Sequence, residues 1–253
     1  MTELAFRYSI RSSLPGHPEE SASVGVKLVN TLDGLNRIDP LIFANWEVMD
    51  FSARTSLPLA VARSRIGTIV ENNVTRDDLG QPEPYYGYAA VAFTRHAIRS
   101  QQINLRIKVG GNCEGDTWLQ AGSYKIFPES SIVTYPVFRE AMLAINAIWP
   151  PPWACADAFK MDYDKAPLFP NAPLFPYSRF HIPWFAYLSA KLAAGVALPS
   201  EILTERTSND GLLMIATEDR LDPTNPKHLQ CARVLAEIMM ARTGYKPGGT
   251  TRV

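Results

Sequence analysis

Histidine and cysteine side chains are the first residues of this chain to consider for catalysis or metal binding. His228 and Cys231 lie three positions apart near the C-terminus, so on one helix both could face a metal ion. A zinc site requires four protein ligands, or three and a water, and no second pair accompanies these two residues. The remaining histidines, His17, His96 and His181, are isolated in the sequence. We therefore predict no metal site and no cofactor.

Carboxylates form two groups that could act as acid–base pairs. Asp77 and Asp78 are adjacent, and Asp157, Asp162 and Asp164 lie close together along the chain. Two carboxyl groups held in one site can work as general acid and general base. A small metal-dependent hydrolase that uses the second group is therefore an open alternative, although solvated loop charges are the simpler interpretation.

The sequence motifs that usually identify an enzyme are missing. The chain has no GxSxG nucleophile elbow, no GxxxxGK[ST] phosphate loop, no HExxH and no GxGxxG. The segment "KVGGNCEG", residues 108–115, is rich in glycine but lacks the spacing and the following helix of a phosphate-binding loop. We interpret it as a turn and predict that the protein is a binding protein and not an enzyme.

The charge of the chain indicates which partners it can bind, and its cysteine content indicates the cellular compartment. Lys plus Arg and Asp plus Glu number 25 each among 253 residues, so the formal net charge is zero. A dedicated nucleic-acid or membrane binder usually has a basic excess, so we expect neither partner. Cys113, Cys155 and Cys231 lie far apart, which is atypical of a secreted disulfide framework. With no signal-peptide pattern and no long apolar run, the expected location is the cytoplasm.

Hydrophobic periodicity and helix-boundary residues predict a single α+β domain spanning residues 1–253. We expect a mixed, largely antiparallel sheet with flanking helices and a long C-terminal helix. Asn225, Pro226 and Gly244 mark that helix as cap, first turn and terminator. Three further helices are predicted in residues 21–40, 58–70 and 134–149. Strands are predicted in residues 4–10, 41–51, 85–97, 103–110, 122–130, 153–159 and 211–217.

Prolines and tryptophans concentrate after the predicted helix 134–149. The stretch "IWPPPWACA", from Ile148 to Ala156, opens a proline-rich region at about residues 150–183, which we interpret as an ordered extended loop. An adaptor module that uses Pro167 to Pro176 as a docking segment is an open alternative. Both tryptophans of the stretch are expected to be buried. The predicted structural core residues are Trp46, Trp149, Trp153 and Trp184.

Two loops combine acidic groups with tyrosines, a combination that suits a basic partner. Carboxylates attract and pair with basic groups, while tyrosines supply rigid contact area. The candidate residues for binding such a partner are Asp77, Asp78, Glu83, Tyr85 and Tyr86 in the first loop and Asp162, Tyr163 and Asp164 in the second.

The order of several motifs resembles the immunity protein 52 family of bacterial polymorphic toxin systems. These motifs span most of the chain from about residue 39 onward. They are "DPLIFANW" (39–46), "YGYAAVAF" (86–93), "IWPPPWACA" (148–156), "IPWFAYLS" (182–189) and "GLLMIATEDRLDPTNPKHLQCARVLAEIM" (211–239).

The resemblance implies an α+β immunity protein that binds and neutralises a cognate toxin. Toxins of such systems commonly carry a restriction-endonuclease-like nuclease domain, and a type VI secretion effector is one plausible source. Because the DNA lies in the cytoplasm, the resemblance implies that location too. It supplies no binding residues, so the acidic tyrosine loops are inferred from their chemistry alone, and the oligomeric state stays open.

Overall fold

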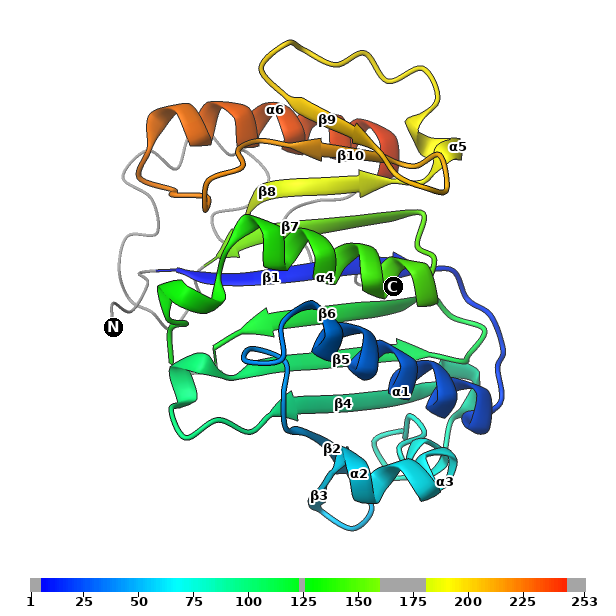
Figure 1. Cartoon of the computed structure of the whole chain (residues 1–253). Coiled ribbons are helices and arrows are strands. Elements are labelled where there is room, and N and C mark those ends of the chain that lie inside the picture. Colours follow the sequence, from blue (N-terminus) through cyan, green and yellow to red (C-terminus); the bar gives the residue numbers. More distant parts are fainter. Residues whose placement is uncertain (1–5, 123–125, 160–180, 245–253) are drawn as a thin grey trace.

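One ten-stranded sheet runs through the protein (Figure 1). The computed structural model describes residues 6–122, 126–159 and 181–244. The strand order is β3-β2-β4-β5-β6-β1-β7-β8-β10-β9, and every pair of neighbouring strands is antiparallel. The strands are β1 (Arg7–Leu14), β2 (Trp46–Asp50), β3 (Thr55–Pro58), β4 (Tyr88–Thr94), β5 (Ile103–Val109), β6 (Gly115–Ala121), β7 (Trp153–Phe159), β8 (His181–Leu188), β9 (Leu203–Arg206) and β10 (Leu212–Ile215).

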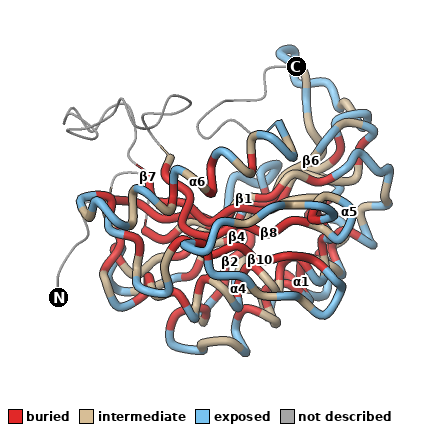
Figure 2. Tube along the Cα trace, turned by 90° about the horizontal axis from the view of Figure 1, so that it is seen from above, coloured by how far each residue is buried: buried red, intermediate tan, exposed pale blue. Residues whose placement is uncertain are grey.

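Helices lie on both faces of this sheet. Seen from above in Figure 2, α1 and α4 lie on one side and α6 on the other. The first side holds much of the core, because Leu28, Leu32 and Leu35 of α1 and Phe138 and Met142 of α4 are fully buried. The helices are α1 (Ser21–Ile38), α2 (Leu59–Ala62), α3 (Ile66–Asn72), α4 (Tyr135–Ile148), α5 (Ala190–Ala193) and α6 (Pro226–Thr243).

The predicted α+β fold with a largely antiparallel sheet and a long C-terminal helix is confirmed. The caps of α6 are those expected from the sequence. The Asn225 side chain accepts a hydrogen bond from the amide of Lys227, and Gly244 adopts a left-handed conformation at φ 67°. Local residue types therefore determine both ends of this helix.

Two predicted elements were wrong in position or continuity. The strand expected over residues 122–130 does not occur in the described part of that range, residues 122 and 126–130, and β6 ends before Gly122, a glycine at φ +80°. The polar residues of "GDTWLQA" suggest a turn, but Thr117, Leu119 and Ala121 alternate towards the core. The helix expected over 58–70 is divided into α2, a 3-10 turn at Arg63–Arg65, and α3.

The predicted loop at about residues 150–183 has strands at both of its described ends. β7 begins at Trp153, and β8 begins at His181 and lies between β7 and β10. Pro183 cannot donate a ladder hydrogen bond, and the register between β7 and β8 shifts at Ala156/Asp157, directly opposite it. A bulge is one of the few ways in which a sheet accepts proline. Residues 160–180, which include Pro167 to Pro176, lie outside the described residues.

The four tryptophans proposed for the core differ in burial. Trp46, Trp149 and Trp184 are buried. Nε1 of Trp149 donates a hydrogen bond of 2.8 Å to Oγ1 of Thr31 on α1. Trp153 is only partly buried and packs against the edge of the core, so the expectation that both tryptophans around the prolines are buried was wrong for Trp153.

Because Trp153 is only partly buried, we expect its removal to lower the stability of the protein moderately. Complete burial of a large apolar side chain stabilises a protein by about 1.5–3 kcal/mol. We expect Trp153→Ala to lower the free energy of unfolding by about 1–2 kcal/mol in urea denaturation. A loss above about 4 kcal/mol would mean that Trp153 belongs to the central core after all.

Candidate functional site

A buried charge cluster joins three neighbouring strands and includes one of the carboxylates considered for catalysis. Asp157 of β7 is completely buried. Its Oδ1 accepts a 2.6 Å hydrogen bond from the Ser9 hydroxyl, and its Oδ2 accepts one of 2.6 Å from Nη2 of Arg11. The same Nη2 lies 2.9 Å from Nδ1 of His181, whose ring stacks on Phe159.

The geometry of this cluster suits structure better than nucleophilic catalysis. A serine nucleophile needs a histidine base within hydrogen-bonding reach, whereas the Ser9 hydroxyl is bonded to Asp157. Burial would raise the pKa of Asp157, but the charge of Arg11 and the contacts with His181 and Ser9 hold that pKa well below its usual range. Asp157 is thus an ionised carboxylate paired within the sheet, and Asp162 and Asp164 lie outside the described residues.

His181 gives the cluster a dependence on pH. Burial and the positive charge of Arg11 lower the pKa of His181 from its ordinary 6.5 and outweigh the opposing effect of Asp157. Below pH 6.5 the unfolded chain therefore binds a proton that the folded chain does not. We expect stability to fall as the pH drops from about 6.5, by at most about 1.4 kcal/mol per pH unit for one proton.

A second loss is expected below the ordinary pKa of 3.8 for an aspartate, because the folded pKa of Asp157 is also lowered. Urea denaturation between pH 4 and 8 would measure the first loss, and a His181→Gln variant should have a flatter profile over that range. An identical profile in the variant would contradict the assignment to His181.

The two C-terminal residues considered for metal binding serve other contacts. Nδ1 of His228 accepts a hydrogen bond from the amide of Asp222, and Sγ of Cys231 lies 3.8 Å from the carbonyl of Glu201. Within residues 6–122, 126–159 and 181–244, no three His, Cys, Asp or Glu side chains form a group that could hold a metal ion.

The first acidic tyrosine loop is an ordered projection next to the start of β4. Its tip is a turn in which Oδ1 of Asp77 accepts hydrogen bonds from the amides of Leu79 and Gln81. Asp77 thus stabilises the turn, whereas Asp78 is exposed and Glu83 is half-buried. The carboxylates of this loop are therefore not equivalent, and Asp78 is the one most available to a partner.

The tyrosines of this loop are exposed but firmly placed. Tyr85 and Tyr86 are 57% and 41% exposed, and their rings meet edge to face with centroids 5.3 Å apart. Leu79, at the tip, is 85% exposed. Exposed rings on an ordered backbone are typical of binding anchors, because little conformational entropy is lost when they are buried. We call Leu79, Tyr85 and Tyr86 the tyrosine patch.

Glycines attach this loop to the turn between β5 and β6. The amide of Asn112 donates a 2.8 Å hydrogen bond to the carbonyl of Tyr85. A Cβ on Gly87 would lie 2.2 Å from the carbonyl oxygen of Val109, and one on Gly111 would lie 2.4 Å from that of Tyr85. The glycine-rich segment 108–115 is therefore a turn that permits close backbone packing and holds the tyrosine patch in place.

A hollow of about 700 Å³ lies beside the tyrosine patch, on the sheet face opposite α1 and α4. Alternation along β5 explains the location, since Leu105 and Ile107 are buried while Arg106 and Lys108 point the other way. Ala89, Arg106, Lys108 and Asp116 form the floor, and residues 51–52 and 72–76 form the walls.

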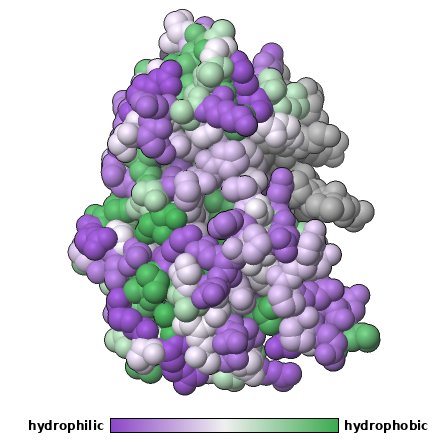
Figure 3. Space-filling model, turned by 90° about the vertical axis from the view of Figure 1, so that its right-hand side faces the viewer, coloured by the Kyte–Doolittle hydropathy of each residue, from purple (hydrophilic) through white to green (hydrophobic). Residues whose placement is uncertain are grey.

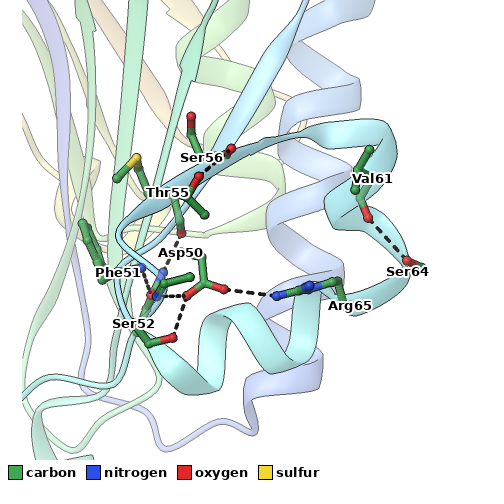
Figure 4. Close-up of polar contacts among 11 residues, drawn as sticks. Asp50, Phe51, Ser52, Thr55, Ser56, Val61, Ser64 and Arg65 are labelled. Carbon is green, nitrogen blue, oxygen red and sulfur yellow. Dashed lines mark hydrogen bonds and ion pairs between the residues drawn. The ribbon is translucent and has the colours of Figure 1, made fainter.

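Hydrogen bonds fix one wall of this hollow (Figure 4). The buried carboxylate of Asp50 accepts hydrogen bonds from the Ser52 hydroxyl at 2.8 Å, the Ala53 amide at 3.1 Å and Nη2 of Arg65 at 3.3 Å. The Ser52 hydrogen bond is the main cause that lowers the pKa of Asp50. Asn73 continues the network by accepting a hydrogen bond from the amide of Phe51. The turn after β2 is therefore a rigid wall.

The end of the molecule that carries the β1–α1 connection and α5 shows how apolar groups are distributed on the surface. In Figure 3 this end is largely hydrophilic, and hydrophobic groups occur in small separate patches. Single exposed apolar residues are ordinary on protein surfaces, whereas one extended patch would mark a large apolar interface. A binding surface here would combine a few anchors with polar and charged contacts.

Comparison with protein families identifies the second half of the chain. Residues 120–247 match the family described as immunity protein 52. The chain belongs to the immunity protein 52 family. The matched part runs from the end of β6 through α4, β7 and β8 to α6, so the expectation drawn from motif order is confirmed. Membership supports an immunity role, and the tyrosine patch lies outside the matched residues.

Comparison with solved structures supports the fold. The chain resembles the Pseudomonas aeruginosa T6SS protein PA0821 with a TM-score of 0.51 and 11% sequence identity, over 94% of this chain and 76% of that one. At this identity the likeness concerns the fold alone. A comparison with curated proteins finds no match. None of the described helices has both the length and the apolar character needed to cross a membrane.

Sequence reasoning selected Tyr85 and Tyr86 of the tyrosine patch as candidates but missed Leu79 and the hollow. Asp77, Asp78, Glu83, Tyr85 and Tyr86 lie in one loop, as their spacing requires, whereas Asp162, Tyr163 and Asp164 fall outside the described residues. The hollow was missed because its residues come from separate strands and loops. The one local signal was the alternation of Arg106 and Lys108 with apolar residues in "INLRIKV".

Proposed function

We propose that this protein binds and neutralises a cognate toxin and that it acts by binding, without catalysing a reaction. Membership of the immunity protein 52 family carries the proposal. The buried, internally paired state of Asp157 supports inhibition by binding over hydrolysis. The ten-stranded sheet, which connects all described segments, supports action as a single domain.

We further propose that the toxin is a nuclease effector of a type VI secretion system and that the two proteins meet in the cytoplasm. The similar fold of a protein described as a T6SS protein supports the secretion system. A nuclease must attract phosphates with basic groups, and the exposed Asp78 beside the tyrosine patch suits such a partner.

Co-expression with the toxin domain encoded beside this gene tests the proposal. We expect survival of the cells and a complex that co-purifies. Survival without a complex would point to enzymatic detoxification instead, and cell death would contradict neutralisation. Catalytically inactive toxin, purified separately, would then provide the dissociation constant.

The tyrosine patch is the contact surface that we propose. Tyr85→Ala combined with Tyr86→Ala should weaken toxin binding at least about 30-fold, since an aromatic hot spot contributes about 2 kcal/mol or more. The melting temperature should change little because both rings are largely exposed. Calorimetric titration with inactive toxin would measure the loss.

Matched controls distinguish a specific effect of the tyrosine patch on toxin binding from the effect of changing any exposed residue. Leu203→Ala removes a 48% exposed apolar residue on β9, at the far edge of the sheet, and should leave binding unchanged. Asp78→Lys tests the charge of the loop without disturbing the turn that Asp77 holds. Full affinity in both the double tyrosine variant and Asp78→Lys would place the interface elsewhere.

A further inference from the structure

The hollow beside the tyrosine patch carries an excess of positive charge. Arg76, Arg106 and Lys108 contribute three cationic side chains, and Asp116 contributes the one carboxylate among the lining residues. Both oxygens of Asp116 are within hydrogen-bonding distance of Nη2 of Arg106, at 3.1 and 3.0 Å. Asp116 therefore compensates Arg106 and leaves the other two cations without a counter-charge inside the hollow.

Lys108 and Arg76 make only weak compensating contacts. In the described part of the chain, no carboxylate lies within 4.0 Å of the Lys108 ammonium, which instead sits 5.7 Å from the centre of the Tyr86 ring. Arg76 donates a hydrogen bond of 2.9 Å to the carbonyl of Gly80. The hollow thus presents two cations to a partner.

We propose that the hollow binds an acidic side chain of the cognate toxin, an aspartate or glutamate that reaches Lys108 and Arg76. The inference rests on the proposed function and adds the chemistry of the partner's contact. Lys108 lies against Tyr86, so the hollow and the tyrosine patch form one continuous surface. A toxin that packs on the patch would therefore place a neighbouring side chain over the hollow.

A carboxylate fits this hollow better than a nucleic-acid phosphate backbone. Phosphate backbones are usually bound by extended basic stripes, and the formal net charge of this chain is zero. Here the cations are confined to one recess, and Lys108 contacts the exposed ring of Tyr86. A carboxylate that pairs with a half-buried lysine beside an aromatic anchor is typical of a protein–protein contact.

Carbodiimide coupling of the wild-type complex provides a direct test, because it joins an ammonium and a carboxylate only where they are in contact. We expect mass spectrometry to find Lys108 joined to an Asp or Glu of the toxin. Lys108→Arg, which keeps the charge but cannot form this product, should bind normally and lose the cross-link. Lys108→Glu should weaken binding about 10- to 100-fold.

Lys191→Glu is the matched control, since this exposed lysine lies on α5, towards the opposite edge of the sheet (Figure 1), and its reversal should leave affinity unchanged. If the wild-type protein binds toxin and Lys108→Glu binds it with the same affinity, the proposed role of the hollow is overturned and the proposed function stays intact. Absence of any wild-type complex would overturn both. A complex that dissociates on nuclease digestion would assign the hollow to nucleic acid and overturn the inference.

Discussion

Asp157→Ala should lower the free energy of unfolding by about 3–5 kcal/mol, the usual cost of removing one partner of a buried ion pair. The substitution removes the buried carboxylate that pairs with the part-buried Arg11 guanidinium and accepts the hydrogen bond of the Ser9 hydroxyl. Urea denaturation at pH 7 would measure the loss. A change below about 1 kcal/mol would show that the cluster contributes little to stability.

Two further variants test whether the charge of Asp157 and its burial cause this loss of stability. Asp157→Asn keeps the size of the side chain but removes the charge, so most of the loss should persist. Arg233→Ala breaks the exposed pair between Arg233 and Glu237 and should cost only about 0.5 kcal/mol. Equal effects of Asp157→Ala and Arg233→Ala would contradict the importance of burial. Toxin affinity of the folded Asp157 variants should stay normal because this side chain is inaccessible.

Trp184→Ala should also cost about 3–5 kcal/mol, as expected when a large buried side chain is deleted from a core. Trp184 of β8 is fully buried and lies against Tyr8 of β1 and both Tyr135 and Phe138 of α4. Its Nε1 donates hydrogen bonds of 3.0 Å to the carbonyls of Thr217 and Asp219. The residue therefore joins strands, a helix and the segment before α6.

Trp184→Phe separates packing from hydrogen bonding. Phenylalanine retains much of the aromatic contact but leaves the carbonyls of Thr217 and Asp219 without their donor, so the expected loss is about 1–2 kcal/mol. Thermal unfolding and urea unfolding should both find the wild type most stable, Trp184→Phe less stable and Trp184→Ala least stable. A phenylalanine variant as unstable as the alanine variant would mean that the two hydrogen bonds, and not packing, account for the effect.

The stabilising residues and the proposed binding surface lie in different parts of the protein. Asp157 and Trp184 lie within the residues that match the family, whereas the tyrosine patch and the hollow are built from residues before residue 120. Substitutions in the patch should therefore alter toxin binding at constant stability, and core substitutions should do the reverse. This separation makes the binding experiments interpretable.

Local patterns in the sequence determined the long helices and several strands. α6 was predictable because Asn225, Pro226 and Gly244 act on backbone groups within one turn of themselves. α1 was predictable because its leucines repeat at helical spacing and are buried together. Tyr85 and Tyr86 could be selected as candidates for the same reason, since they are neighbours in the chain.

Only the tertiary structure decided what depends on residues far apart in the sequence. β8 lies in the sheet despite Pro183 because a bulge opposite Asp157 removes the need for its missing amide hydrogen. The Asp157 cluster joins Ser9, Arg11 and His181 through strand register, and the hollow combines strands with loops 51–52 and 72–76. Sequence periodicity reports which face of an element is apolar, but the pairing of strands decides which charges meet.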